Sequence, residues 1–131
     1  KAFRNARLNL IMIRRGCGSW QCNCRQPHSV PYTVTGKCGS VRVKLIPAPK
    51  GKGLISEKEC QKILRLAGIK DVWTKSYGNT GTKVNLIKAC MNALETLIIT
   101  KIQPQHRESF GILDGQRGQY ETPTPTQAEA E

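Results

Sequence analysis

The chain has 131 residues, 38% of them hydrophobic and 23% charged, which is enough for one compact domain with a single core but too short for two. Twenty-one Lys and Arg side chains against nine Asp and Glu leave a formal charge of +12, a balance typical of proteins that bind an anionic partner such as RNA. The apolar runs fall far short of the roughly 20 residues that cross a bilayer, and we expect no secretory leader, so the sequence predicts a cytoplasmic protein without membrane contact. In that compartment the six cysteines should be reduced thiols or metal ligands rather than disulfides.

The basic residues are concentrated in the first part of the chain. Residues 1–56 contain no Asp or Glu, and Glu57 is the first acid. The eleven basic side chains of that segment are Lys1, Arg4, Arg7, Arg14, Arg15, Arg25, Lys37, Arg42, Lys44, Lys50 and Lys52. A surface that serves only solubility normally mixes both signs. We therefore interpret the acid-free segment as part of a binding surface, against the alternative of a solubilising charge excess.

Two short segments precede the main domain. Residues 1–13 place apolar side chains near helical spacing with Arg4 and Arg7 between them, which predicts a short amphipathic helix. Such a helix is marginal alone, so we interpret it as the terminal helix of an otherwise missing N-terminal RNA-binding domain. Residues 14–27 are rich in Gly, Cys and polar residues and are expected to form a linker loop.

Alternating apolar residues then predict a β-hairpin. The first strand carries its apolar side chains at positions 30, 32 and 34, the second at positions 41, 43 and 45, and residues 36–39 form the turn. Arg42 and Lys44 occupy the opposite face of the second strand. We expect that face of the sheet to be basic, because the apolar side must meet the core.

A helix, a strand and a second helix follow the hairpin. Ser56 and Glu59 have the spacing of a capping box, which predicts a helix over residues 57–67. Residues 69–76 are typical of a strand, and the apolar pattern of residues 83–97 predicts the second helix. The expected fold of residues 28–102 is a two-layer α/β domain, a β-hairpin followed by helix, strand and helix, with the helices packed on one face of a mixed sheet. Residues 103–131 are expected to be an acidic, largely disordered tail.

An ordered series of motifs gives the chain a family resemblance. These motifs are PHSVP (27–31), TGKCGSVRV (35–43), LIPAPKGKGLI (45–55), LAGIKDVWTK (66–75) and GNT (78–80). Together they resemble the C-terminal domain of the universal small-subunit ribosomal protein five, with similarity from about residue 1 to 99. The segment RRGCGSWQCNC (14–24) resembles the archaeal branch, because bacterial members lack this cysteine-bearing loop.

The resemblance implies a function and a set of partners. It implies a structural constituent of the small ribosomal subunit that binds folded ribosomal RNA and supports assembly and decoding accuracy. Ribosomal proteins four and eight of the small subunit would be neighbours, and messenger RNA would enter nearby. The location would be the cytoplasmic ribosome, and no catalytic residue or cofactor is implied.

We expect phosphate contacts to dominate RNA binding. The predicted contact residues are Arg14, Arg15, Arg25, Lys37, Arg42, Lys44, Lys50, Lys52, Lys75 and Lys83. Lys50 and Lys52 lie in a Pro- and Gly-rich loop over residues 47–53 that precedes a helix start, where free amides favour anions. The loop from Lys75 to Lys83 should lie on the same side if both loops are at helix N-termini. Its Tyr77 would stack on a base or cover the core, and the second role is the more common one.

Four potential metal ligands fall within twelve residues of the cysteine-rich loop: Cys17, Cys22, Cys24 and His28. They are enough for a tetrahedral zinc site, but one residue between Cys22 and Cys24 differs from the usual spacing of two or more. We therefore assign no metal, and expect buried thiols with His28 bonded to the backbone or to RNA. A zinc-dependent or redox module remains the alternative. The remaining thiols, at positions 38, 60 and 90, are interpreted as packing residues.

Catalysis has little support in the sequence. Two histidines are present, the acids lie mostly in the tail, and no triad or paired carboxylate emerges. The family's fold is similar to that of some small-molecule kinases, so the alternative function is a phosphate-ligand-binding enzyme of a related kinase-like fold. The loop over residues 47–53 lacks the Ser-rich continuation of such enzymes, and no general base stands out.

Overall fold

The computed structural model describes residues 1–115 of the chain, and the last sixteen residues, 116–131, lie outside the described part. Its elements in chain order are α1 (Ala2–Leu8), β1 (Arg14–Arg15), β2 (Val34–Cys38), β3 (Val41–Pro47), β4 (Leu54–Ile55), α2 (Lys58–Leu66), β5 (Val72–Tyr77), α3 (Lys83–Ile99), α4 (Pro104–Ser109) and β6 (Leu113–Asp114).

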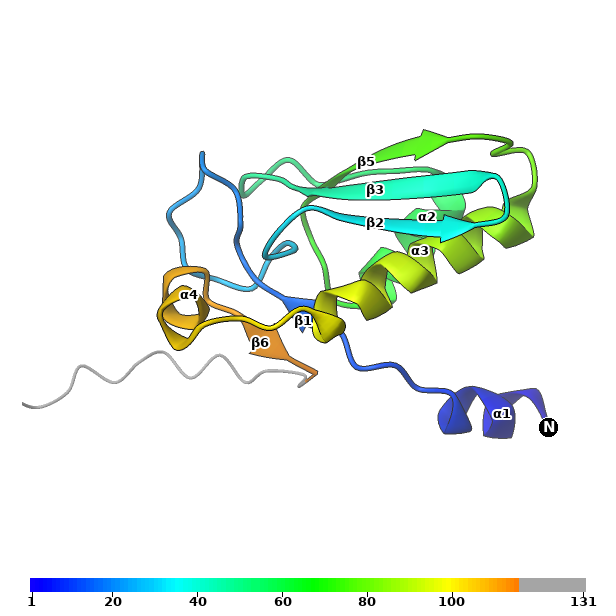
Figure 1. Ribbon diagram of the computed structural model, residues 1–131, viewed down its shortest axis with the longest axis horizontal. Coiled ribbons are helices and arrows are strands. Elements are labelled where there is room, and N and C mark those ends of the chain that lie inside the picture. The colour runs from blue at the N-terminus through cyan, green and yellow to red at the C-terminus, as the bar shows by residue number, and fades with distance from the viewer. Residues whose placement is uncertain (116–131) are drawn as a thin grey trace, which may run out of the picture.

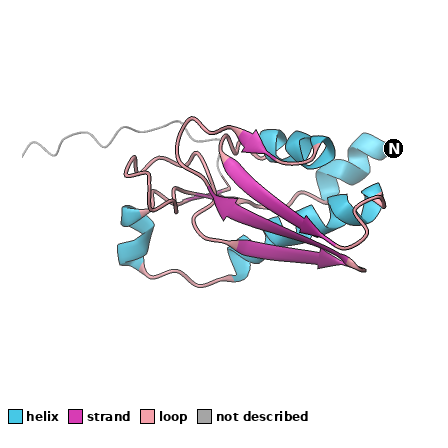
Figure 2. Ribbon diagram, turned by 90° about the horizontal axis from the view of Figure 1, so that it is seen from above, coloured by secondary structure: helices cyan, strands magenta, loops and turns pink. Residues whose placement is uncertain are grey.

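The main sheet has four strands in the order β2-β3-β5-β4. β2, β3 and β5 pair antiparallel, and β4 runs parallel to β5. Helices α2 and α3 lie on one face of this sheet, and the other face is left free of helices (Figure 1). The view from above looks onto the strands with the helices beneath them (Figure 2). The predicted two-layer α/β fold with a mixed sheet is confirmed.

Burial follows the alternation of the strands. In β3, Val41, Val43 and Leu45 are buried while Arg42 is exposed, because successive side chains of a strand point to opposite faces. Helix α3 contributes the broad opposing surface, with Leu86, Ala89, Cys90, Ala93, Leu94 and Leu97 buried. Cys60 and Cys90 lie fully inside this core and Cys38 packs against it, so the interpretation of these thiols as packing residues is confirmed.

Three local details differ from the sequence prediction. The first strand begins at Val34 rather than at residue 30, and the two-residue strand β4 was not predicted. The capping box is wrong: Glu57 is the N-cap of α2 and makes no side-chain cap hydrogen bond. Ser56 Oγ is buried and has no hydrogen-bond partner among the described residues, because the chain is still leaving β4 at that position.

Residues 103–115, the first part of the segment expected to be a largely disordered tail, contain regular secondary structure. They form α4 and then β6, which pairs antiparallel with β1 (Figure 1). Ile112 is buried, and Asp114 forms an ion pair with Arg14. These apolar and ionic contacts outweigh the polar composition of the segment. The rest of the predicted tail, residues 116–131, is outside the described residues.

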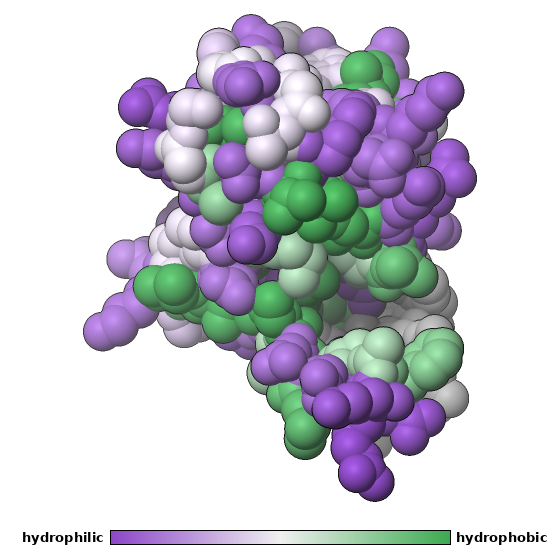
Figure 3. All heavy atoms as spheres, turned by 90° about the vertical axis from the view of Figure 1, so that its right-hand side faces the viewer, coloured by the Kyte–Doolittle hydropathy of each residue, from purple (hydrophilic) through white to green (hydrophobic). Residues whose placement is uncertain are grey.

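Helix α1 stands apart from the domain. None of its residues is buried, and Phe3 and Leu8 are 87% and 77% exposed. Viewed from the hairpin end of the sheet, hydrophilic side chains dominate the upper part of the molecule, while α1 at the bottom presents a mixture of hydrophobic and hydrophilic side chains (Figure 3). Within residues 1–115, no helix is both long and apolar enough to cross a membrane.

Candidate nucleic-acid interface and cysteine cluster

The helix-free face of the sheet gathers four of the ten predicted RNA-contacting residues. Lys37 of β2 lies opposite Arg42 of β3, and Lys44 of β3 lies opposite Lys75 of β5. Three of these side chains are exposed and Lys44 is half-buried. Tyr77 lies opposite Arg42 in the same row. We call these five residues the basic sheet face.

The basic sheet face is electrostatically unfavourable in the free protein. Like charges directly opposite each other on neighbouring strands destabilise a sheet, and this face contains two such pairs, Lys37–Arg42 and Lys44–Lys75. Strands β2, β3 and β5 carry no acidic residue. Within residues 1–115, none of the four cations has a carboxylate at ion-pair distance. An anionic ligand would remove this repulsion.

The face is also hollowed at the hairpin end. A depression of about 650 Å³ is lined by Thr35, Lys37, Gly39, Ser40, Arg42, Lys44, Tyr77 and Gly78. Tyr77 is 52% exposed and covers no core, so the more common role assumed for it from sequence is wrong. Its ring lies beside cations, where it is able to stack on an unpaired base.

The two loops that were expected on one side lie at opposite ends of the sheet. Gly53, at the end of the first loop, donates to Asp71 just before β5 begins, whereas Gly78 packs against Ser40 where β5 has ended. The expectation failed because β4 separates the first loop from α2. Lys52 is exposed, and Lys50 Nζ donates to Gln26 Oε1 at 3.0 Å.

The N-terminus of α3 contains Lys83, which does not belong to the basic sheet face. Lys83 forms an ion pair with Glu57, the N-cap of α2. The hydrogen bond with this carboxylate raises the pKa of Lys83. Its charge is therefore already matched by an acid in the free protein.

Arg14 is a structural residue and not part of an accessible surface. It is 7% exposed, and its Nε donates to Asp114 Oδ1 at 2.6 Å while Nη1 donates to the carbonyls of Leu97 and Thr100 at 3.0 and 2.8 Å. Burial works to lower its pKa, but the hydrogen bond and charge of Asp114 raise the pKa overall. The prediction that Arg14 contacts RNA is not supported, because these donors are satisfied inside the protein.

Arg15 and Arg25, two other predicted RNA contacts, are more accessible than Arg14. Arg15 is half-buried and its guanidinium lies against Gly68, at the end of α2. Arg25 is exposed and adopts a left-handed backbone conformation with φ of 51°, which turns the loop between Cys24 and His28. Neither residue belongs to β2, β3 or β5, the strands that form the basic sheet face.

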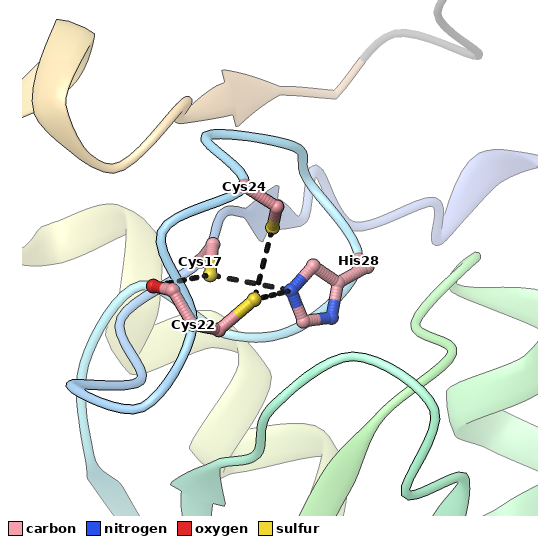
Figure 4. Close-up of side chains that lie close together, drawn as sticks. All are labelled: Cys17, Cys22, Cys24 and His28. Atoms are coloured by element: carbon pink, nitrogen blue, oxygen red, sulfur yellow. Dashed lines mark hydrogen bonds between the residues drawn. The ribbon is translucent and has the colours of Figure 1, made fainter.

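The structure brings the four potential metal ligands of the loop together. The side chains of Cys17, Cys22, Cys24 and His28 point toward one another (Figure 4), with their ligand atoms all within 4.8 Å. His28 Nε2 lies 3.2 Å from Cys17 Sγ and 3.5 Å from Cys22 Sγ, and Cys22 Sγ lies 3.2 Å from Cys24 Sγ. The ring of His28 therefore contacts two thiols, and not a backbone group, which was one of the two partners expected from sequence.

A buried carboxylate that the sequence did not identify orients His28. Asp71 Oδ2 lies 2.8 Å from His28 Nδ1, and both residues are almost fully buried, at 5% and 4% exposure. The amides of Lys70 and Asp71 also donate to the carbonyl of His28. The contact of Cys17, His28 and Asp71 has the composition of a nucleophile triad, but it is enclosed within the protein. The only sequence signal for Asp71 is an acid at the start of a buried strand.

The thiols of this cluster differ in acidity. Burial and hydrogen bonds with Cys24 and Cys22 raise the pKa of Cys17 to about 12. Burial acts in the same direction on Cys22, but hydrogen bonds from the backbone of Lys50, from Cys24 and from His28 lower its pKa to about 6. Of Cys17 and Cys22, Cys22 is therefore the thiol that more readily becomes a thiolate.

Known proteins match this chain over the domain that contains the basic sheet face. The family described as ribosomal protein S5, C-terminal domain, matches residues 36–101. A protein of Methanocaldococcus jannaschii named small ribosomal subunit protein uS5 is 48% identical over 115 residues, which are 88% of this chain and 53% of that protein. Proteins of the same name from Nanoarchaeum equitans and Staphylothermus marinus are 52% and 58% identical over 88% and 72% of this chain, and 50% and 44% of their own lengths. The chain spans about half the length of the curated relatives it matches.

Proposed function

The chain belongs to the uS5 family of small-subunit ribosomal proteins, and from this premise we propose that its basic sheet face binds folded small-subunit ribosomal RNA. The role is structural: the domain docks on phosphates, contributes to assembly of the subunit and carries out no reaction. We propose the cytoplasmic ribosome as its location.

One observation carries this proposal. Two like-charged pairs, Lys37–Arg42 and Lys44–Lys75, lie side by side on a sheet face that has no acid. A folded protein tolerates such repulsion when a polyanion occupies the surface, because each cation then meets a phosphate and releases counterions. Tyr77 adds an exposed ring to the same face, which suits stacking on a base in single-stranded or bulged RNA.

Three of the six remaining predicted contacts make a second, smaller contribution. We propose that Arg25, Lys50 and Lys52 approach RNA at the opposite end of the sheet, where all three are exposed. Small-subunit ribosomal proteins four and eight as neighbours, and messenger RNA entering nearby, are further proposals that rest on the family resemblance. The enzyme of a kinase-like fold is not proposed, because the matched relatives are ribosomal proteins.

Salt dependence of RNA binding tests the proposed face. The fourfold variant Lys37→Gln, Arg42→Gln, Lys44→Gln and Lys75→Gln is titrated with a small-subunit ribosomal RNA transcript over a range of salt concentrations. Each cation that neutralises a phosphate contributes a log-log slope of about −0.7 to −0.9, so we expect the slope to become shallower by about 3.

The matched control removes the same charge from the helical side. It replaces the exposed residues Lys58, Lys62, Arg65 and Lys88 by Gln. We expect the control to keep the slope of the unmodified chain to within about one phosphate. If both variants lost the same amount of salt slope, the effect would depend on net charge alone, and a specific binding face would be refuted. Circular dichroism of each variant confirms that the fold is retained.

A further inference from the structure

We propose that Cys17, Cys22, Cys24 and His28 bind one Zn²⁺ ion at a closed structural site. This inference goes beyond RNA binding and does not depend on it. It revises the sequence interpretation, in which the spacing of Cys22 and Cys24 argued against a metal. Metal binding depends on where the four ligand atoms lie in the folded protein, and not on the number of residues between two of them.

The ligand atoms already approach the geometry of a tetrahedral site. Zinc binds thiolates at about 2.3 Å and imidazole nitrogen at about 2.0–2.1 Å, so ligand atoms around one ion lie roughly 3.5–3.8 Å apart. The three contacts of this cluster measure 3.2, 3.2 and 3.5 Å, and no pair exceeds 4.8 Å. To create the site, the two contacts of 3.2 Å would lengthen by a few tenths of an ångström and the longest separations would shorten by at most about 1 Å.

The donor set is chemically selective. Three thiolates and one imidazole suit zinc, whereas hard cations such as Mg²⁺ and Ca²⁺ require oxygen ligands. All four positions would be filled by the protein, which is the pattern of a structural site and leaves none for a substrate or water. Cys17 and His28 are 4% exposed, so the ion would be largely shielded from solvent.

The orientation of His28 provides independent support. Its Nδ1 faces Asp71 Oδ2 at 2.8 Å, and Asp71 Oδ1 accepts a hydrogen bond from the amide of Gly53 at 2.8 Å. A proton on Nδ1 donated to this carboxylate leaves the lone pair of Nε2 directed at the sulfurs. Histidines that bind zinc almost always donate their other ring nitrogen to such a partner.

Backbone contacts hold the loop in this arrangement. The amide of Cys17 donates to the carbonyl of Phe110 at 2.8 Å, and Gly16 and Ser29 exchange two hydrogen bonds of 2.9 Å. The amide of Gly53, at the end of residues 47–53, donates to Asp71, the partner of His28. An ion at the centre would therefore tie three segments together: the cysteine-rich loop, residues 47–53 and the start of β5.

Metal analysis of the full 131-residue chain tests the proposal. Protein expressed with zinc in the medium and purified without chelators should contain about one zinc per chain by inductively coupled plasma mass spectrometry. Cys22→Ser should lose stoichiometric zinc. The matched control is Cys38→Ser, which removes a half-buried thiol outside the cluster and should retain it. Asp71→Asn should weaken zinc binding about 10- to 100-fold in a chelator competition, because it replaces the carboxylate that faces His28 Nδ1 by a neutral amide.

A second measurement on the unmodified chain guards against variants that fail to fold. Cobalt substitution should give the intense visible absorption of a tetrahedral thiolate site. Zinc well below one equivalent with all six thiols reduced, or octahedral cobalt, would overturn the proposal. A Cys22–Cys24 disulfide found by mass spectrometry in freshly purified protein would also overturn it, as would undiminished zinc in the Cys22→Ser variant.

Discussion

At the scale of single residues, Arg14 shows that a basic side chain in a basic protein need not face the partner. Its guanidinium joins α3 to β6, since it donates to the carbonyls of Leu97 and Thr100 and to the carboxylate of Asp114. A buried charge is tolerated only when it is paired and hydrogen-bonded, and here all three acceptors lie in segments more than eighty residues away in sequence.

We predict that Arg14→Gln destabilises the fold without a specific effect on RNA binding. The loss of charged hydrogen bonds should lower the free energy of unfolding by about 1–3 kcal/mol, measured by urea denaturation. The control is Arg25→Gln, which removes the same charge from an exposed position and should stay within about 0.5 kcal/mol. A stable Arg14→Gln protein with a shallower salt slope would instead place Arg14 at the RNA interface.

Sequence reasoning found the ligand residues of the cysteine cluster but not the residue that orients them. Cys17, Cys22, Cys24 and His28 are recognisable because they are close in sequence. Asp71 is 43 residues from His28, and only the packing of β5 against the loop brings it near. A partner set by tertiary structure leaves no local pattern, which is why Asp71 was missed.

At the scale of elements, Gly36 allows α3 to cross β2 closely. A Cβ atom at this position would lie 2.0 Å from the carbonyl oxygen of Ala89 and 2.4 Å from the amide nitrogen of Ala93. These are backbone atoms of a helix, which cannot move aside individually. The strand therefore requires glycine for space rather than for its backbone angles.

We predict that Gly36→Ala costs about 1–3 kcal/mol of stability through overpacking, measured by thermal or urea unfolding. Gly81→Ala is the matched control, because its new methyl group would meet only the side chain of Asn79 at 3.3 Å. If Gly36→Ala were as stable as the control, the close approach of α3 to β2 at Gly36 would be refuted.

The register of β3 and β5 leads to a second prediction, in which one substitution raises the stability of the free chain and lowers its affinity for RNA. Lys75→Glu places a carboxylate opposite Lys44 and converts repulsion into attraction. We expect the free chain to gain about 0.2–1 kcal/mol of stability and RNA affinity to fall, as measured by urea unfolding and RNA titration. Lys88→Glu on α3 is the control of equal charge change. A loss of both stability and affinity would mean that Lys75 stabilises the folded domain.

Element prediction succeeded where the pattern was long and regular. The alternation over residues 41–45 identified β3, because each buried residue is followed by one facing outward. In contrast, β4 has two residues, one half-buried and one exposed, and contains no detectable period. Its existence depends on parallel pairing with β5, a tertiary contact that only the folded chain provides.

At the scale of the whole molecule, the pairing of β1 and β6 joins residues 14–15 to the end of the described chain. Their pairing places Arg14 opposite Asp114. The carbonyl of Phe110 accepts a hydrogen bond from the amide of Cys17. The sequence of residues 103–115 looks polar and weakly structured, so its order could not be predicted locally. The order arises because the segment contacts residues 13–17, through pairing with β1 and through backbone hydrogen bonds with Ile13 and Cys17.

We predict that a chain ending at residue 102 is less stable and binds zinc less tightly than one ending at residue 115. The truncation removes the burial of Ile112, worth about 1.5–3 kcal/mol, and the ion pair of Arg14 with Asp114, worth about 1–3 kcal/mol. It also removes the carbonyl that fixes Cys17. Urea unfolding and chelator competition measure the two effects. The chain ending at Gly115 keeps every contact described here and is the control. Equal stability and equal zinc affinity of the two chains would show that α4 and β6 contribute neither to the domain nor to the cysteine cluster.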